Sequence, residues 1–465
     1  MLFRALVSAS LPLLAFGAQI RRQDPAASSS AAGTTPAGTG TATPAATSMT
    51  PPPEVPITLV STNPTAFPLS AIVATPVTHT AQPLASTPSA GQQPSAVGSN
   101  APPLPAANSI VIANYPALDK TPPTDSPEVK QWIQDVANSG IPIPNIAPAV
   151  AGGCSANPGR AGNSSICWWT CGQCTRDSDI TTCPDKLTWG VSFDDGPSPD
   201  TPRLLDYLQS QNLHSTFFVV GSRALSRPEI LQAEYMAGHQ ISVHTWSHSA
   251  LTTLTNEQII AELGWTAKII KDVTGVTPNT FRAPYGDIDD RVRAIGRAMG
   301  FTSIIWTGYT NPQTNQLDNF DTNDWHIAAG TVSASGVIAA FENILQSATL
   351  LNTGFIVLAH DLYQQSVDLA IGYILPDALA RRNPQFKMMS IIECLGMPLA
   401  NAYKETNDNA TNPVPTGINQ SISYAGASAA ATSTAGHTGG ALSTSPSTLW
   451  HVVGLAGALV AAYTL

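Results

Sequence analysis

Residues 188–193, Thr-Trp-Gly-Val-Ser-Phe, form a short apolar run that passes directly into Asp194-Asp-Gly-Pro-Ser198. Further apolar runs of strand length follow at 215–220, 240–243, 302–306, 355–359 and 386–390. Segments whose apolar residues recur about every 3.6 positions separate several of these runs, as at 256–273 and 287–299. Because strands that alternate with helices pair in parallel, the sequence predicts an α/β fold with an open or closed barrel.

Polar clusters stand at the ends of the predicted strands, where α/β barrels carry their chemistry. Asp194 and Asp195 follow the first strand, and His244-Thr-Trp-Ser-His248 follows the third. Two histidines four residues apart lie on one face of a helical turn and can share one metal ion. With Asp195 they would form a three-ligand site with open positions, which is typical of a catalytic metal rather than a structural one.

Three more clusters follow along the chain. The first, Arg282-Ala-Pro-Tyr-Gly286, offers a cation for a neighbouring carboxylate and a tight turn that can present a backbone N–H. In the second, Asp324 stands beside Trp325, and in the third, His360 ends an apolar strand. Taken singly, Asp-Asp-Gly is usually a solvated turn, and one histidine at a strand end is usually structural. Five such clusters at successive strand ends indicate a single active site.

The five clusters resemble, in type and order, the motifs of the polysaccharide deacetylases, which are the family 4 carbohydrate esterases. In this sequence the clusters lie at 193–198, 244–248, 282–286, 324–325 and 358–361. The resemblance covers about 183–395, and no motif residue departs from the family pattern. It implies a distorted (β/α) barrel of the polysaccharide deacetylase type. It also implies removal of acetyl groups from a polysaccharide with the help of a divalent metal, Zn²⁺ or alternatively Co²⁺.

The resemblance assigns the metal site and the catalytic base. Asp195, His244 and His248 match the metal ligands of the family. Asp194 matches the base that activates water, and Arg282 matches the residue that orients this base. These roles agree with the chemistry of metal-assisted amide hydrolysis, in which a positioned carboxylate handles one proton.

The resemblance also assigns the acid and the acetyl pocket. His360 matches the general acid that protonates the leaving amine, and Asp324 matches the residue that tunes it. The backbone N–H of Tyr285 would contribute to an oxyanion hole, while Trp325 and Leu358 would line the acetyl pocket. Three histidines match no role and are expected to be structural, namely His214, His239 and His326.

The composition of the 465-residue chain restricts its partners. Charged residues make up 11% of the chain, the formal net charge is −10, and no basic block occurs. These features disfavour nucleic acid and anionic lipid as partners, and they are compatible with a neutral sugar polymer.

The N-terminal part has the features of an exported chain. Residues 1–18 combine Arg4, an apolar run and small residues near Gly17, which predicts a signal peptide. The region 19–118 is rich in Ser, Thr, Pro and Ala, with Glu54 as the one charged residue between 25 and 118. Such a segment has little apolar surface to bury, so the sequence predicts a disordered, O-glycosylated stalk.

The C-terminal part is predicted to be a second stalk over 401–440, followed by an anchor signal over 441–465. The apolar segment 449–465 is shorter than the roughly 20 residues of a membrane-spanning helix. Small residues and a polar spacer precede it, a pattern typical of a glycolipid (GPI) anchor signal. Three glycosylation sequons agree with export, namely Asn163, Asn409 and Asn419.

Cysteines in an exported chain are first interpreted as disulfides. Cys183 precedes the first strand and Cys394 follows the last, so a bridge between them would close the deacetylase domain, 183–400. A Cys-rich lead-in, 119–182, is expected to pack on this domain. The lead-in contains four cysteines, namely Cys154, Cys167, Cys171 and Cys174. Four cysteines can form two disulfides in three different pairings, and the alternative is that they bind zinc.

The lead-in, stalks and anchor signal resemble those of the fungal chitin deacetylases within the family. This implies that chitin or another N-acetylglucosamine polymer is the substrate, and that the enzyme acts at the outer face of the plasma membrane and the cell wall. Two alternatives stay open. The same mechanism could serve O-acetyl xylan or peptidoglycan, and a wall protein could use the barrel only to bind polymer.

Overall fold

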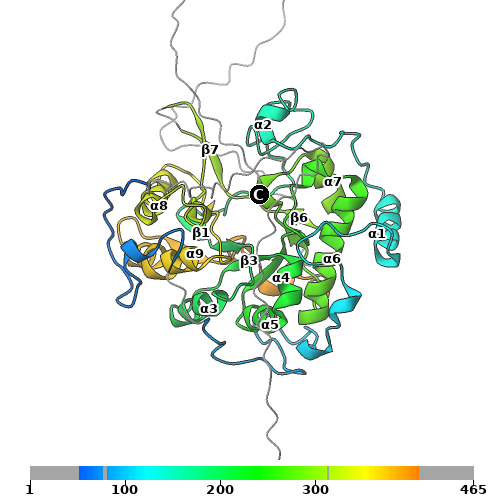
Figure 1. Ribbon diagram of the computed structural model, residues 1–465, viewed down its shortest axis with the longest axis horizontal. Coiled ribbons are helices and arrows are strands. Elements are labelled where there is room, and N and C mark those ends of the chain that lie inside the picture. Colours follow the sequence, from blue (N-terminus) through cyan, green and yellow to red (C-terminus); the bar gives the residue numbers. More distant parts are fainter. Residues whose placement is uncertain (1–51, 77–80, 312–313, 408–465) are drawn as a thin grey trace, which may run out of the picture. The chain divides into compact units, whose positions relative to one another are not determined.

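The computed structural model describes residues 52–76, 81–311 and 314–407 (Figure 1). The predicted signal peptide, the anchor signal and the sequons Asn409 and Asn419 lie outside these residues, as does the predicted stalk beyond Asn407. Within the described ranges, no helix has the length and apolar character needed to cross a bilayer.

A parallel sheet carries most of the predicted strands. Its order follows the chain: β2 (Ser192–Asp194), β3 (Thr216–Val219), β4 (Gln240–Val243), β5 (Thr280–Phe281) and β6 (Thr302–Ser303). In its register Phe193 pairs with Phe217, and Phe217 pairs with Ile241. A second parallel sheet places β1 (Thr188–Gly190) between β9 (Phe355–Ile356) and β10 (Lys387–Met389).

The two sheets join into a distorted barrel, as predicted. Strands β1 and β2 are consecutive, with Val191 between them, so one stretch of chain belongs to both sheets. On the other side, the N–H of Thr307 donates to the carbonyl of Ile356 at 3.0 Å, which connects the chain after β6 to β9. A two-stranded antiparallel hairpin, β7 (Gly308–Thr310) and β8 (Leu317–Asn319), follows β6.

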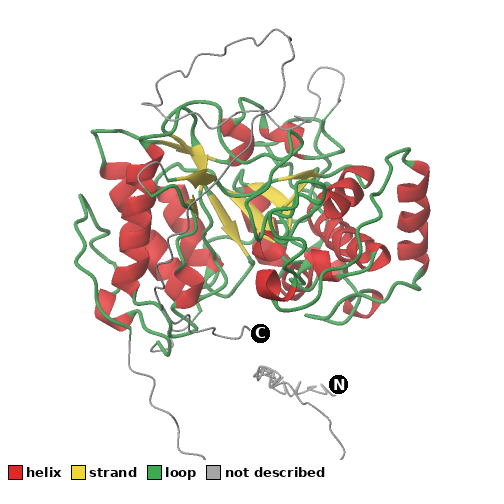
Figure 2. Cartoon of the chain, turned by 90° about the horizontal axis from the view of Figure 1, so that it is seen from above, coloured by secondary structure: helices red, strands yellow, loops and turns green. Residues whose placement is uncertain are grey.

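Helices surround the strands, as Figure 2 shows. The α-helices are α1 (Pro127–Asn138), α2 (Gly153–Ala156), α3 (Thr201–Ser210), α4 (Gly221–Ser226), α5 (Pro228–Met236), α6 (Asn256–Thr274), α7 (Asp290–Ala298), α8 (Ala334–Ala348), α9 (Gln364–Leu369), α10 (Leu375–Ala380) and α11 (Ile391–Cys394). A π-helical turn, η7 (Ala370–Ile374), joins α9 to α10. The 3-10 turns are η1 (Leu69–Ala71), η2 (Ala107–Ser109), η3 (Ile112–Asn114), η4 (Leu251–Thr253), η5 (Pro284–Gly286), η6 (Asp324–His326) and η8 (Leu399–Ala402).

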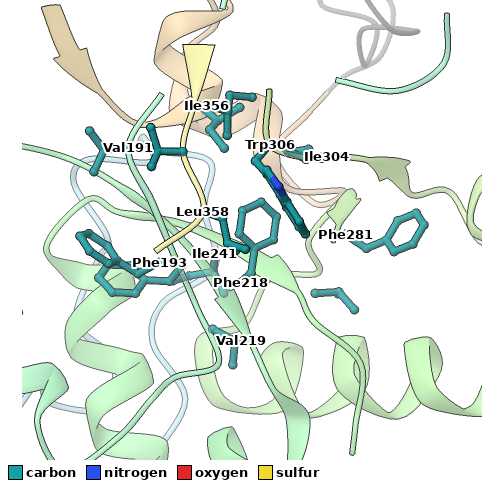
Figure 3. Packing of buried hydrophobic residues seen from close by; sticks show 14 of the residues in the cluster. Val191, Phe193, Phe218, Val219, Ile241, Phe281, Ile304, Trp306, Ile356 and Leu358 are labelled. Atoms are coloured by element: carbon teal, nitrogen blue, oxygen red, sulfur yellow. The ribbon is translucent and has the colours of Figure 1, made fainter. Parts of the chain in front are cut away.

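Helix α6 illustrates why these boundaries arise. Thr255 and Gln258 form a reciprocal capping box at its start, and Gly275, with φ of +87°, ends it in the left-handed conformation. Between these ends most side chains are buried, because the helix packs against α1, α4, α5 and α7. The core beneath is apolar and aromatic, and Figure 3 shows Phe193, Phe218 and Ile241 packed within it.

The described part of the 19–118 region corrects the expectation of a disordered stalk. We call residues 52–76 and 81–121 the strap. Ile72, Val97 and Leu104 of the strap are buried. The strap follows the barrel from α8 towards α6 (Figure 1), and its backbone bonds to barrel groups, for example from the Asn63 N–H to the Gly372 carbonyl at 2.8 Å.

The physical reason is that the strap needs no core of its own. A few apolar side chains of the strap pack against the barrel, so the strap buries apolar area that its own composition could not enclose. Prolines reduce the conformational entropy that the chain loses on ordering. The prediction of a disordered stalk, which rested on composition alone, is therefore wrong for the strap.

The predicted domain boundary at residue 400 is also corrected. Tyr403 is fully buried, and its hydroxyl accepts a hydrogen bond from the Ile241 N–H at 3.1 Å. The Lys404 N–H donates to the Thr277 carbonyl at 2.9 Å. The folded unit therefore continues at least to Asn407, because an aromatic side chain fills a site beside β4 that local composition does not reveal.

The six cysteines form three disulfides. Cys183 is bridged to Cys394, as predicted, and this bond joins the two ends of the barrel. The pairing that the sequence left open is Cys154 with Cys171 and Cys167 with Cys174. In the lead-in, Trp132 of α1 packs edge-to-face on Trp265 of α6, with 5.5 Å between ring centroids.

Candidate active site

The five clusters meet at the C-terminal ends of the barrel strands. Asp194 ends β2 and pairs with His360 through a parallel β-bridge. The chain after β4 supplies the segment 244–248, which we call the metal loop, and Arg282 directly follows β5. Asp324 begins η6, and its carboxylate reaches His360. Strand ends that are far apart in the sequence thus bring all five clusters into one site.

Asp195, His244 and His248 form a cluster suited to one metal ion. One ligand atom from each lies within 4.8 Å of the others. Oδ1 of Asp195 is 3.3 Å from Nε2 of His244 and 3.1 Å from Nε2 of His248. Asp195 and His244 are buried, and the His248 side chain is 20% exposed.

The donor set fits a divalent cation. Oδ1 of Asp195 is buried and accepts no hydrogen bond, so a cation would satisfy it. Nδ1 of His244 lies 2.8 Å from the Arg282 carbonyl and must donate to it, which leaves the lone pair on Nε2 directed at the cluster. One carboxylate and two imidazoles are ligands typical of zinc and similar ions.

The backbone around these ligands is strained. Asp195, Thr245 and His248 have positive φ angles of 79°, 66° and 57°. Non-glycine residues hold such conformations only where the surrounding structure fixes them. In the metal loop, the buried carboxylate of Glu262 accepts from the backbone N–H groups of Trp246 and Ser247, at 2.7 and 2.9 Å.

Asp194 is held by Arg282 inside the barrel. Nη1 of Arg282 donates to Oδ1 of Asp194 at 2.6 Å and to Oγ of Ser192 at 3.1 Å. The guanidinium also lies over the ring of Phe218, 3.8 Å from its centroid. Oδ2 of Asp194 is 3.8 Å from Nε2 of His244, so the second oxygen faces the metal-ligand cluster. This arrangement leaves one oxygen of Asp194 for proton transfer.

His360 and Asp324 form a buried pair beside the cluster. Nδ1 of His360 donates to Oδ1 of Asp324 at 2.6 Å, and the His360 backbone N–H donates to Oδ2 at 2.9 Å. Burial by itself lowers the pKa of His360, but the charge and hydrogen bond of Asp324, together with Asp195 and Asp194, raise it to about 10. His360 is therefore protonated at neutral pH and can act as an acid.

The residues predicted to supply the oxyanion contact and the acetyl pocket, namely Tyr285, Trp325 and Leu358, differ in exposure. Tyr285 has φ of +60° and is 54% exposed, and its ring contacts His248 with 4.6 Å between centroids. Leu358 is buried. The ring of Trp325 stacks on that of His326, with 3.6 Å between ring centroids.

The other two histidines without a predicted role lie in structural contacts. Nδ1 of His214 is 2.9 Å from Oε1 of Glu393. His239 is buried, and its Nδ1 accepts a hydrogen bond from the Ser215 N–H at 3.2 Å. The sequon Asn163 is exposed.

Sequence reasoning missed two residues that hold the ligands. Arg223 of α4 donates from Nη1 to the Asp195 carbonyl at 2.7 Å and lies 3.8 Å from its Oδ1. Glu262 of α6 fixes the metal loop as described above. Neither carries a local signal, because each reaches the site from a helix through tertiary packing.

Comparison with known proteins identifies the family of the chain. Residues 181–304 match the sequence model of the family described as Polysaccharide deacetylase, and the chain belongs to this family. Chitin deacetylase 1 of Cryptococcus neoformans var. grubii serotype A is 56% identical over 76% of this chain and 73% of its own length. The chitin deacetylase of Amylomyces rouxii is 39% identical over 42% of this chain, which spans 46% of that relative.

Similar solved structures were also found. A peptidoglycan N-acetylglucosamine deacetylase is 26% identical and matches 47% of this chain and 94% of its own, with a TM-score of 0.39. The chitin deacetylase of Colletotrichum lindemuthianum is 24% identical and matches 50% of this chain and 97% of its own, with a TM-score of 0.41.

Proposed function

We propose that the chain acts as a chitin deacetylase. It hydrolyses the N-acetyl groups of N-acetylglucosamine residues in chitin and leaves chitosan and acetate. The observation that carries this proposal is the geometry of the site, where a three-ligand cluster lies beside the Asp194–Arg282 pair and the His360–Asp324 pair. The 56% identity to Chitin deacetylase 1 supports chitin as the substrate over xylan or peptidoglycan.

Asp195, His244 and His248 would hold the metal, for which we propose Zn²⁺, with Co²⁺ as an alternative. A bound divalent cation supplies a Lewis acid that polarises the acetyl carbonyl and makes water more acidic. Asp194 takes one proton from the attacking water, because Arg282 occupies only its other oxygen. The water oxygen then bonds to the acetyl carbon.

His360 completes the reaction by giving its Nε2 proton to the amide nitrogen as the C–N bond breaks. The hydrogen bond from Nδ1 to Asp324 fixes the ring with Nε2 free for this transfer. The products are acetate and a free amine on the sugar. We assign the oxyanion contact to the backbone N–H of Tyr285, and the acetyl methyl group to a pocket lined by Trp325 and Leu358.

Acetate release from chitin oligomers tests the proposal. A chelator should abolish release, and Zn²⁺ or Co²⁺ should restore it. His244→Ala should bind the metal poorly and release little acetate, whereas His214→Ala, which changes a histidine outside the cluster, should keep both properties. A His244→Ala protein with full metal content and activity would falsify the assignment.

We also propose that the chain is exported and held at the outer face of the plasma membrane by a GPI anchor. The support is the composition of residues 1–18 and 441–465, and an oxidising compartment would maintain three disulfides. A phosphatidylinositol-specific phospholipase should release active enzyme from intact cells. Recovery of mature protein that still contains Trp450 would contradict the anchor.

A further inference from the structure

The end of the strap covers the middle of the metal loop. Trp246, between the ligands His244 and His248, is fully buried. The ring of Tyr115 stacks on its indole, with 6.1 Å between centroids and 1° between planes. The carbonyl of Ala117 accepts a hydrogen bond from Nε1 of Trp246 at 3.0 Å. The strap thus supplies both the apolar cover and the polar partner of this side chain.

Further contacts connect the strap to the backbone around the loop. Oγ of Ser222 lies 3.2 Å from Oδ1 of Asp119 and 2.5 Å from the Trp246 carbonyl, so its single proton is shared between these two acceptors, and the Ser222 N–H donates to the same carbonyl at 3.1 Å. Oγ1 of Thr121 lies 3.3 Å from Oγ of Ser249, the residue that follows His248. The strap therefore approaches the middle of the loop and its C-terminal end.

Tyr115 is itself fixed on α6. Its hydroxyl donates to Oδ2 of Asp272 at 2.5 Å, and its ring meets Trp265 edge-to-face at 5.9 Å between centroids. Nζ of Lys268 lies 5.4 Å from the ring centroid. Because these contacts come from α6, a helix that packs on the barrel, they hold the Tyr115 ring in place against Trp246.

The metal loop needs such support because its backbone is strained at Thr245 and His248. Glu262 holds the loop from the barrel side through two backbone N–H groups. Without the strap, the indole of Trp246 would be partly exposed to water on the other side, and the loop could relax towards a conformation with less strain. The two histidine ligands would then lose their alignment.

We propose that residues 115–121 of the strap are a positioning element for His244 and His248, so that metal affinity depends on a segment outside the barrel. The inference rests on the proposed metal site. Groups that orient metal ligands typically change metal affinity by about 10–100-fold when they are removed. We expect a loss of this size when the Tyr115 ring is removed.

The test compares Tyr115→Ala with Tyr115→Phe and with Leu104→Ala in the full chain. Leu104 is a buried strap residue whose backbone bonds are to Gly91 and Gln92, also in the strap. The Zn²⁺ dissociation constant is measured by competition with a chelating dye, and thermal unfolding of the metal-free proteins measures stability. Tyr115→Ala should weaken Zn²⁺ binding about 10–100-fold. Tyr115→Phe should bind nearly as wild type, and Leu104→Ala should lose stability but keep its Zn²⁺ affinity.

Each outcome decides one question. If wild type binds no metal, the proposed function fails. If wild type binds one ion and Tyr115→Ala binds it as tightly, or if Leu104→Ala weakens binding equally, the positioning role is overturned. Should Tyr115→Ala not fold, the double variant Asp119→Ala, Thr121→Val replaces it, because it removes the polar contacts and keeps the ring. Unchanged Zn²⁺ affinity in that variant would also overturn the role.

Discussion

Arg282 donates a hydrogen bond from Nη1 to Oδ1 of Asp194 at 2.6 Å, and both side chains are buried. A buried ion pair of this kind is costly to break, because the remaining charge stays buried without its partner. The pair therefore does more than orient the base. The guanidinium also compensates the negative charge of a carboxylate whose side chain is only 2% exposed.

The first prediction concerns this pair. Arg282→Met should leave the buried Asp194 carboxylate without the hydrogen bond that orients it, so that its free oxygen is no longer held in position to take a proton from water. Turnover should fall by about 10²–10⁴, the range for loss of a positioned base. Arg282→Lys should recover part of the activity. Acetate release and metal content, measured on the same samples, separate this effect from metal loss, and near-normal turnover in Arg282→Met would contradict it.

The second prediction concerns pH. Burial lowers the pKa of His360, but Asp324, together with Asp195 and Asp194, raises it to about 10, so the imidazolium persists well above pH 7 and is lost as pH rises through that pKa. Asp324→Asn removes the negative charge, so the pKa of His360 should fall and the alkaline limb of kcat/KM should move to lower pH by more than about one unit. Asp318→Asn, which changes an exposed carboxylate of the β7–β8 hairpin, serves as control. If the alkaline limb of kcat/KM lies at the same pH in wild type, Asp324→Asn and Asp318→Asn, the role of Asp324 is refuted.

Much of the barrel and of the site could be predicted because the signals are local. Asp194 and Asp195 directly follow an apolar strand, and His244 and His248 occupy one short segment at the end of another. A parallel barrel brings such strand ends together whatever the details of its packing. The positions of these residues in the sequence were therefore enough to predict which side chains meet in the site.

The strap and the supporting helical residues could not be predicted in this way. Tyr115 lies in a segment with almost no charge and little apolar periodicity, and its importance arises from the matching surface of Trp246. Arg223 and Glu262 sit within helices, where charged residues usually face solvent. Only the packing of α4 and α6 on the barrel turns these two side chains towards the ligands.

The third prediction concerns the disulfide between Cys183 and Cys394. It links residues 211 positions apart, so it restricts the unfolded chain strongly. Replacing both cysteines with serine should lower the free energy of unfolding by about 2–5 kcal/mol. The Cys154–Cys171 bridge spans 17 positions, and its double serine variant should lose less. Denaturant unfolding measures both, and a larger loss for the shorter loop would show that loop length does not govern the effect.

The last prediction concerns Gly196, which lies between the metal ligand Asp195 and Pro197. A Cβ added to Gly196 would lie 2.2 Å from Oδ2 and 2.5 Å from Oδ1 of Asp361. Asp361 cannot move aside easily, because it is fully buried and its Oδ2 accepts a hydrogen bond from the Thr201 hydroxyl at 2.5 Å. Gly196→Ala should therefore displace either Asp361 or the backbone that carries Asp195.

Overpacking of this kind costs about 1–3 kcal/mol of stability, and we expect weaker Zn²⁺ binding as well because Asp195 is the adjacent residue. Gly159→Ala is the control, since a methyl group there meets no atom within 4 Å. A double-mutant cycle isolates the clash: in an Asp361→Ala background the carboxylate is absent, so adding Gly196→Ala should cost much less than it does in wild type. Equal costs in the two backgrounds would mean that Gly196 is required for its backbone conformation and not for the close approach of Asp361.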